Sequence, residues 1–290
     1  MRGEKKFYIF FALPGLIYIF AVTLVPIILT LIYSFQKYFF TKPTDKIMWV
    51  GFSNYLKIFQ SEYFWSSMQN TVIFLIVGVA IEFILGLIIA LLFDAAFKKN
   101  NIATSLILLP SIAAPLVVGL IFRYMYNAEF GIASFVLNKL GLFNNISLLG
   151  NKNTALGAII SADIWQWTPF VAIILLSGLI GLPHEPFEAA RIDGANYFGI
   201  LRRITLPLLK PVIRIVILLR IVDVIKEFDK IFVMTYGGPG VASEVLNFTA
   251  YRVNYVNFDM GLGSAYVMLI LIIIILISIF LVKVLKTEEF

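Results

Sequence analysis

Three ionisable residues with helical spacing lie in a largely apolar stretch of the sequence that also contains Arg214, Lys226, Asp229 and Lys230. Arg220, Asp223 and Glu227 are spaced i, i+3 and i+7, so a continuous helix would place them on one face. Val224 falls between them. Ionisable groups in apolar segments normally face a cavity, a partner or each other. We expect this face to line a central cavity and to hydrogen-bond a polyhydroxylated ligand. The alternative is that Arg220 and Asp223 pair and fix helix packing.

A polar and aromatic segment in an earlier apolar stretch could face this set. It reads Asp163-Ile-Trp165-Gln166-Trp167-Thr-Pro169-Phe170. Ring faces stack on sugar rings, and carboxylate and amide groups bond to hydroxyls; the alternative is that the tryptophans fill the core. Glu82 and Arg123 indicate helix–helix contacts. Lys226 and Lys230 are expected on other faces, with the lower charges near an aqueous mouth.

The remaining composition leaves little chemistry for an enzyme. The chain has no cysteine and one histidine, His184 in a polar connection, so we expect no catalytic residue and no metal site. The formal charge of +6 comes from scattered Lys and Arg without the basic stripe that follows a phosphate backbone, so no nucleic acid is expected. No G-x-x-x-x-G-K-[ST] loop is present, so ATP must be bound elsewhere.

The elements that must position these residues are membrane-spanning helices. Of 290 residues, 60% are hydrophobic and 14% are charged, and the mean hydropathy is +0.93. A soluble fold could not bury that much apolar surface. A span needs about 20 mostly apolar residues, and the even number of spans places the loops on consistent sides. The six predicted spans are 7–35, 71–93, 102–124, 156–180, 212–234 and 263–285.

The distribution of Lys and Arg predicts the orientation. With the N-terminus inside, the cytoplasmic segments hold 11 basic residues and the longer outer segments hold 7. Because cytoplasmic loops carry the excess of Lys and Arg, both termini are expected in the cytoplasm. The first span is too long for the core of a signal peptide, so we expect it to be retained.

One predicted cytoplasmic loop, residues 181–211, differs from the others. Pro186 suits the first turn of a helix, and Glu188 suits its positive end. Gly194 can adopt the left-handed conformation that ends a helix. A second amphipathic stretch, Tyr197–Thr205, is expected to end before Leu206-Pro207, and Pro211 is expected to open the next span. Two short helices meeting at a glycine would fit the groove of another protein.

This loop resembles a known family signature. The order Glu188-Ala189-Ala190-x-x-Asp193-Gly194-Ala195, followed by Ile204-x-Leu206-Pro207 and Pro211, is similar to the EAA signature of permease subunits in binding-protein-dependent ABC importers. The family usually has an aromatic residue where this chain has Leu201. Gly51-Phe-Ser-Asn54-Tyr55 and Asn70-Thr71 resemble the segment that leads into the family's second span. Thr235-Tyr-Gly237-Gly238-Pro239-Gly240 resembles a segment found in one branch of the family, which contains the first permease of maltose and glycerol-3-phosphate importers.

The resemblance implies a fold and a set of partners. It implies an all-α polytopic membrane protein of the type I ABC importer architecture, with residues 1–290 forming a single permease domain in a prokaryotic inner membrane. The partners would be a second, unlike permease, an extracytoplasmic solute-binding protein, and two ATP-binding cassette subunits that bind ATP and Mg²⁺. No cofactor is expected in this chain.

The resemblance also implies residue roles. The positions expected to couple to the ATPase are Glu188, Ala189, Ala190, Asp193, Gly194, Ala195, Leu206 and Pro207. The positions expected to contact sugar are Asp163, Gln166, Trp167, Arg220, Val224 and Glu227, and the helical spacing adds Asp223.

The expected function is ATP-driven import of a carbohydrate by alternating access. The main alternative is an ion-coupled secondary transporter, which the charged fifth span would suit, although such carriers often contain paired repeats. An intramembrane aspartyl protease using Asp223 and Asp229 is disfavoured, because residues six apart lie on opposite faces of a helix. The sequence leaves open whether the carbohydrate is neutral, acidic or phosphorylated.

Overall fold

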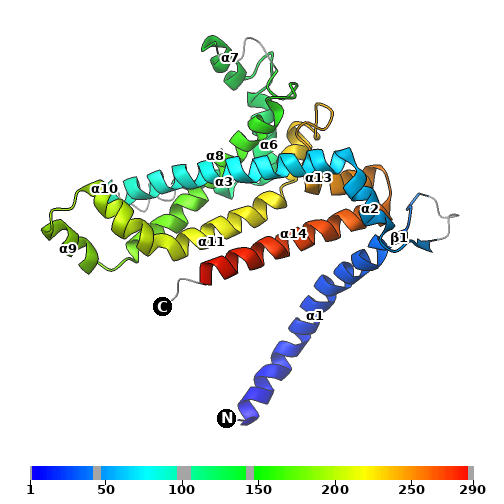
Figure 1. Ribbon diagram of the computed structural model, residues 1–290, viewed down its shortest axis with the longest axis horizontal. Helices are drawn as coiled ribbons and strands as arrows, with labels where there is room; N and C mark the ends of the chain where they lie inside the picture. Colours follow the sequence, from blue (N-terminus) through cyan, green and yellow to red (C-terminus); the bar gives the residue numbers. More distant parts are fainter. Residues whose placement is uncertain (1, 42–46, 97–105, 142–146, 287–290) are drawn as a thin grey trace. The chain divides into compact units, whose positions relative to one another are not determined.

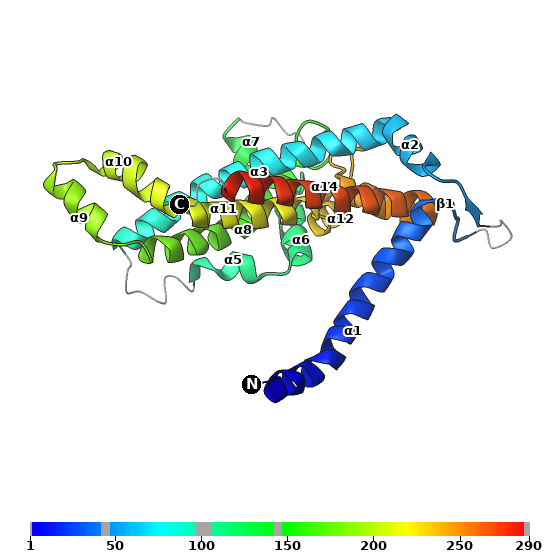
Figure 2. The same cartoon turned by 60° about the horizontal axis from the view of Figure 1, so that its bottom comes forward.

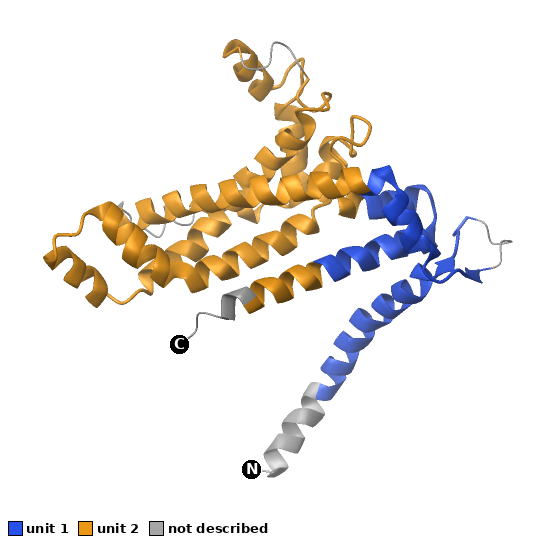
Figure 3. Cartoon of the chain, viewed as in Figure 1, with its two compact units in different colours: residues 1–64, 249–273 blue, residues 65–248, 274–290 orange. Residues whose placement is uncertain are grey.

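The computed structural model describes residues 2–41, 47–96, 106–141 and 147–286. It divides into two compact units (Figure 3), one formed by residues 1–64 and 249–273 and the other by residues 65–248 and 274–290. We call them unit 1 and unit 2. A single permease domain over residues 1–290 stays a prediction.

The described chain is mostly helical (Figures 1 and 2). Two short strands, β1 (Gln36–Lys37) and β2 (Met48–Trp49), pair antiparallel with Gln36 opposite Trp49. Two π-helical turns span Leu201–Thr205 and Arg252–Val256. The helices are α1 (Arg2–Ser34), α2 (Ser53–Gln60), α3 (Glu62–Ala96), α5 (Leu109–Ile112), α6 (Pro115–Met125), α7 (Ile132–Lys139), α8 (Ala155–Ile180), α9 (Glu185–Ile192), α10 (Tyr197–Ile200), α11 (Leu206–Ile225), α12 (Asp229–Met234), α13 (Leu246–Tyr251) and α14 (Met260–Lys286).

Four of the described helices are long and apolar enough to cross a membrane. They are α1, α3, α8 and α14, and they correspond to the predicted spans 7–35, 71–93, 156–180 and 263–285. The number of six spans stays a prediction, because the predicted spans 102–124 and 212–234 are not continuous helices in this structure.

The predicted span 102–124 is interrupted by a proline. Residues 102–105 lie outside the described residues. Further on, α5 ends at Ile112 and α6 begins at Pro115. Ala114 has an extended conformation, with φ −61° and ψ 135°. The residue before a proline avoids the helical region, because the proline ring collides with its backbone. A continuous helix here was therefore a wrong expectation.

The predicted span 212–234 is also interrupted. Helix α11 ends at Ile225, and α12 begins only at Asp229. Phe228, just before α12, has a φ of −140° and a ψ of −48°, outside the helical region. The side chain of Glu227 turns back to accept a hydrogen bond from the backbone N–H of Lys230 at 3.0 Å. This bond satisfies a donor that the start of a helix leaves free.

In unit 1, Asn54 connects the end of α1 to the strand that follows it. Its side-chain amide donates to the carbonyl oxygens of Ser34 and Gln36, both at 2.9 Å. Tyr55 donates to the hydroxyl of Ser34 at 2.8 Å. In this structure, Asn54 and Tyr55 of the family-like segment 51–55 thus form hydrogen bonds that hold the end of α1.

In unit 2, α3, α8 and α11 lie side by side (Figures 1 and 2) and share an apolar core. Leu175 of α8 and Leu209 of α11 are fully buried there. Glycine permits the close approach: a Cβ atom at Gly178 would lie 2.8 Å from Leu209 Cδ1, and one at Gly86 would lie 2.6 Å from Val171 Cγ1. Small residues commonly allow helices to pack closely in membranes.

The loop after α12 is tied to α3 within unit 2. Asn70 donates to the carbonyl oxygens of Val241 at 3.2 Å and Glu244 at 2.9 Å. The hydroxyl of Thr71 accepts the backbone N–H of Leu246 at 3.0 Å. Asn70 and Thr71 therefore hold in place the chain that follows the glycine-rich segment 235–240. No local sequence pattern predicts this long-range contact.

Candidate functional site

The most unusual feature of unit 2 is a group of five charged residues that converge from separate helices. We call it the charge cluster. Glu82 and Lys230 are 0% exposed, Asp163 and Arg220 are 1% exposed, and Glu227 is 10% exposed. These residues come from α3, α8, α11, the α11–α12 break and α12. Buried charges are rarely tolerated without partners, so their contacts define the site.

Arg220 binds two carboxylates from two other helices. Its Nε and Nη2 atoms donate to the two oxygens of Glu82 at 2.7 and 3.0 Å. The same Nη2 atom donates to Asp163 Oδ2 at 2.9 Å. Forked contacts of this kind fix the orientation of a guanidinium. Glu82 thus makes a helix–helix contact, as expected from the sequence. The closest contact of Arg220 with Asp223 is longer, at 3.8 Å, so Asp223 is not its main partner.

Lys230 connects the cluster to the break in the fifth stretch. Its Nζ lies 3.0 Å from Asp163 Oδ1 and donates to Glu227 Oε2 at 2.9 Å. Asp163 therefore binds Arg220 through one oxygen and Lys230 through the other. The expectation that Lys230 lies on another face, near an aqueous mouth, was wrong. The expectation assumed one continuous helix from Arg220 to Lys230, but α11 ends at Ile225.

The predicted shared face of Arg220, Asp223 and Glu227 needs the same correction. Glu227 lies beyond the end of α11 and is brought to the cluster by the break, not by the helical repeat. Asp223 is 42% exposed and lies 3.3 Å from Lys226, a more exposed pair. Val224 is buried in α11.

The other predicted pathway residues have separate surroundings on α8. The Gln166 amide nitrogen donates to the carbonyl oxygen of Ala113 at 2.8 Å, where the break between α5 and α6 exposes the backbone. Its Oε1 atom is buried without a hydrogen-bond partner among the described residues. The ring of Trp167 is half-buried and lies 4.9 Å from the guanidinium carbon of Arg220. Trp165 instead packs against Phe122, with ring centroids 5.5 Å apart and the ring planes tilted by 60°.

The structure therefore joins most of the predicted pathway set and adds two members. Asp163, Arg220, Glu227 and Trp167 are in contact through the cluster, whereas Gln166 binds the α5–α6 break. The sequence identified Glu82 as a contact residue without its partner, and it misplaced Lys230. Charge balance is the sequence signal that could have connected these residues, because a buried carboxylate in an apolar run requires a nearby cation.

The second candidate site is the loop of α9 and α10, which we call the EAA-like loop (residues 181–205). Pro186 lies in the first turn of α9, together with the acidic residues Glu185 and Glu188. Helix α9 has no buried residue in this chain. Figure 1 shows α9 and α10 beyond the ends of α8 and α11.

Gly194 ends α9 as predicted. Its φ is +76°, and its N–H donates to the carbonyl oxygen of Arg191 at 3.1 Å. The N–H of Ala195 donates to the Ala190 carbonyl oxygen at 2.9 Å. This pair of bonds is the Schellman arrangement, which favours glycine at the left-handed position. The next helix begins with Asn196, whose side chain accepts the N–H of Gly199 at 2.7 Å.

The predicted end before Leu206-Pro207 was wrong. The chain continues from α10 through the π-helical turn Leu201–Thr205 directly into α11, so that Pro207 and Pro211 lie within helical structure. The N–H of Leu206 bonds to the carbonyl oxygen of Leu201, five residues earlier. This wider turn lets the helix continue into a first turn with Pro207, whose missing N–H is not required there.

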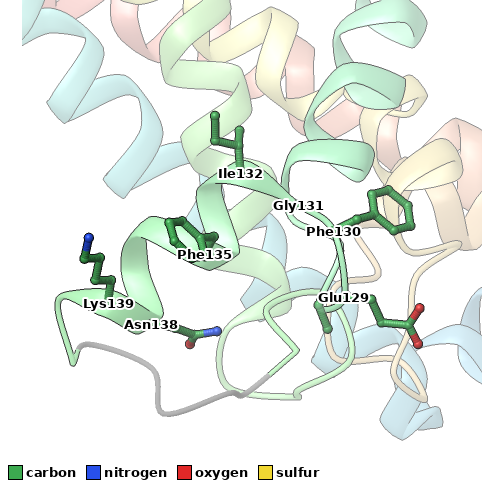
Figure 4. A pocket seen from close by; sticks show the side chains of 8 residues that line it. Glu129, Phe130, Gly131, Ile132, Phe135, Asn138 and Lys139 are labelled. Carbon is green, nitrogen blue, oxygen red and sulfur yellow. The ribbon is translucent and has the colours of Figure 1, made fainter.

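A separate pocket at α7 has few ionisable side chains. Figure 4 shows it lined by Glu129, Phe130, Ile132, Phe135 and Lys139, among others. Its lining is largely apolar, and none of these residues belongs to the charge cluster or the EAA-like loop. The two sites described above remain the better candidates.

The fold and these two sites define a helical membrane protein with an exposed, capped loop. Comparison with known proteins makes the assignment specific. The model of the family described as the binding-protein-dependent transport system inner membrane component matches residues 82–287. The chain belongs to this family, and it is a transport subunit and not an enzyme.

One curated relative is 38% identical over 236 residues, covering 81% of this chain and 79% of the relative. It is the trehalose/maltose transport system permease protein MalF of Thermococcus litoralis. This similarity confirms the resemblance to permeases of maltose-type importers.

Two solved structures share the fold. A bacterial ABC transporter involved in import of the acidic polysaccharide alginate matches with a TM-score of 0.83 and 20% identity, covering 100% of this chain and 99% of that one. A bacterial alginate ABC transporter in complex with an alginate pentasaccharide-bound periplasmic protein matches with a TM-score of 0.78 and 21% identity, covering 97% and 94%. At this identity they support the fold of an ABC importer permease.

Proposed function

We propose that this chain is one of two permease subunits of an ATP-driven importer, and that it moves a carbohydrate from an external binding protein into the cytoplasm by alternating access. Its partners would be a second permease, two ATP-binding cassette subunits that bind ATP and Mg²⁺, and an extracytoplasmic solute-binding protein. Both termini would lie in the cytoplasm.

The EAA-like loop carries this proposal. Its large apolar side chains face outward in the isolated chain: Ile192 is 87% exposed and Phe198 is 77% exposed. Exposed apolar groups on a short, capped helix are typical of a protein interface. The Schellman turn at Gly194 and the Asn196 cap hold the two helices of the loop in one shape. A loop of this kind can transmit movement of an ATPase subunit to α8 and α11, to which it is directly joined.

The carbohydrate substrate is inferred from the relative and from the pathway residues. The relative's name specifies trehalose and maltose. We assign the pathway to the region of Asp163, Gln166, Trp167, Arg220, Asp223, Val224 and Glu227. Within it, the half-buried ring of Trp167 supplies a stacking face, and the partly exposed carboxylate of Asp223 supplies a hydrogen-bond acceptor.

Transport by the reconstituted complex tests the proposal. The chain would be purified with its partner permease and ATPase, placed in proteoliposomes and supplied with its binding protein and radiolabelled trehalose or maltose. We expect uptake that requires internal ATP and is unaffected by a proton uncoupler. Uptake that continues without ATP and stops with the uncoupler would favour the ion-coupled alternative. A complex that hydrolyses ATP without importing either sugar would exclude the proposed substrates.

The orientation has its own test. Because the chain contains no cysteine, single cysteines can be introduced without a background. A cysteine at Ala189 should react with a membrane-impermeant thiol reagent only from the cytoplasmic side, whereas one at Asn151 should react from outside. Labelling of the Ala189 position from outside would contradict the proposed docking of the ATPase.

A further inference from the structure

The contacts of Glu82 give it a role that is distinct from ligand binding. Its carboxylate is 0% exposed, and both of its oxygens accept hydrogen bonds from Arg220. Because both oxygens are occupied by Arg220, the carboxylate is not available to a ligand in this conformation. Any effect of Glu82 on transport would therefore act through Arg220.

Arg220 in turn contacts the aromatic ring proposed to stack on the substrate. The guanidinium carbon lies 4.9 Å from the centre of the Trp167 ring. A guanidinium stacked on an aromatic face is held by the ring and also restrains it. Trp167 has a second restraint in Phe170, whose ring packs edge-on with centroids 5.8 Å apart. The Trp167 ring is thus oriented by one cation and one aromatic neighbour.

The fork between Glu82 and Arg220 determines where that cation lies. Asp163 contacts only the Nη2 atom, and a single contact allows the guanidinium plane to rotate. The two bonds from Glu82 occupy Nε and Nη2 and fix both the plane and its distance from α3. No other described residue forms a forked contact with this guanidinium.

We propose that Glu82 is a positioning residue for transport: it orients the Arg220 guanidinium, which orients the Trp167 ring in the substrate pathway. The inference rests on the proposed function of Trp167 as a stacking surface. Loss of Glu82 should change the orientation of the Trp167 ring and reduce sugar transport without disrupting assembly. A purely structural role would not have this effect.

Charge balance makes the test possible. The cluster contains three carboxylates and two cations. Glu82→Met removes one carboxylate and leaves Asp163 and Glu227 to balance Arg220 and Lys230. The variant therefore leaves no unpaired buried cation, and methionine suits an apolar helix. Glu62→Gln, an exposed acid in the first turn of the same helix, is the matched control.

The experiment measures assembly, coupling and the state of Trp167 in the complete transporter. The chain contains four tryptophans, and fluorotryptophan labelling with fluorine NMR allows the Trp167 resonance to be identified by its loss in Trp167→Phe. In Glu82→Met we expect a normal yield of complex, a shifted Trp167 resonance and about tenfold fewer trehalose molecules imported per ATP hydrolysed, the equivalent of one charged hydrogen bond. Glu62→Gln should leave all three unchanged.

The outcomes separate the possible roles. An assembled Glu82→Met complex with an unchanged Trp167 resonance and unchanged import per ATP would overturn the proposal. Uptake and ATP hydrolysis reduced in equal proportion would also overturn it, because that result indicates a purely structural residue. If Glu82→Met does not assemble, Glu82→Gln, which keeps one acceptor oxygen, is measured in the same way. A wild-type complex that imports no trehalose would reject the proposed substrate, while the Trp167 resonance would still test the positioning role.

Discussion

The EAA-like loop and the charge cluster are held together by opposite kinds of interaction. In the EAA-like loop the stabilising bonds join residues close in sequence, such as Ala195 with Ala190 and Asn196 with Gly199. In the charge cluster they join residues far apart, such as Arg220 with Glu82 and Lys230 with Asp163. The loop is exposed, whereas the cluster is enclosed.

This difference fits the roles proposed for the two regions. A loop built from local bonds keeps its shape even when its surroundings move, which suits a contact that follows an ATPase. A cluster built from long-range ion pairs makes α3, α8, α11 and α12 depend on one another. Changes in the loop should therefore affect coupling and spare the core, and changes that leave a cation or carboxylate of the cluster unbalanced should affect the core first.

The largest effect is expected from Lys230→Met. Removing this cation leaves three buried carboxylates with Arg220 as the only cation of the cluster. Removal of one partner from a buried ion pair typically costs about 3–5 kcal/mol, because an unpaired charge remains in a low-dielectric environment. We expect a strong loss of assembled complex and a lower melting temperature, measured by thermal unfolding in detergent or nanodiscs. Lys226→Met is the control, since Lys226 is 54% exposed; equal melting temperatures for the two variants would contradict the distinction.

Gly194→Leu should have the next largest effect, and it should be confined to coupling. A φ of +76° costs a side chain about 1–2 kcal/mol, so the Schellman turn should open and displace α9. We expect ATPase subunits to be lost during purification, or ATP hydrolysis to continue without uptake, with an unchanged melting temperature for the permease. Gly141→Leu is the matched control, because Gly141 has a φ of +72° and equally open surroundings. If both variants uncouple ATP hydrolysis from uptake to the same extent, the effect does not depend on the position of the glycine, and the specific role of the EAA-like loop is contradicted.

Glu188→Lys should have a smaller effect that separates helix stability from docking. Both Glu188 and Glu185 lie in the first turn of α9, where an acidic side chain contributes about 0.3–1 kcal/mol through the helix dipole. Only Glu188 belongs to the EAA-like motif. We expect Glu188→Lys to reduce uptake and co-purification of the ATPase more than Glu185→Lys does. Equal losses would mean that the dipole accounts for both and that Glu188 has no specific contact.

The smallest effect on uptake is expected from Asn196→Ala, because Asn196 caps a helix but does not belong to the EAA-like motif. Loss of an N-cap side chain costs about 1 kcal/mol, and here the lost bond is the one from the N–H of Gly199. Hydrogen exchange should accelerate in α10 and remain unchanged in α8. Asn196→Ser, which retains an acceptor oxygen, should restore most of the protection. Unchanged exchange in Asn196→Ala would show that the cap does not hold the loop.

The accuracy of the sequence predictions follows the same division. The end of α9 at Gly194 and the acidic first turn of α9 were predictable, because each depends on residues within one helical turn. The four long spans were predictable from hydropathy. The breaks at Ala114 and at Lys226–Phe228 were not recognised, and they moved Glu227 and Lys230 from the faces that a continuous helix would give them. The continuation through Pro207 was missed because a π-helical turn leaves no strong local pattern.

The sequence by itself determined the four long apolar spans, the family signature and the end of α9 at Gly194, because hydrophobicity, glycine conformation and helix-terminal preferences act over a few residues. Only the tertiary structure decided which charges meet. Arg220 had a nearby carboxylate in Asp223, yet its main partners are Glu82, 138 residues away, and Asp163, 57 residues away. Ion pairing depends on distance in space, and that distance is set by the packing of α3, α8 and α11 around their shared apolar core.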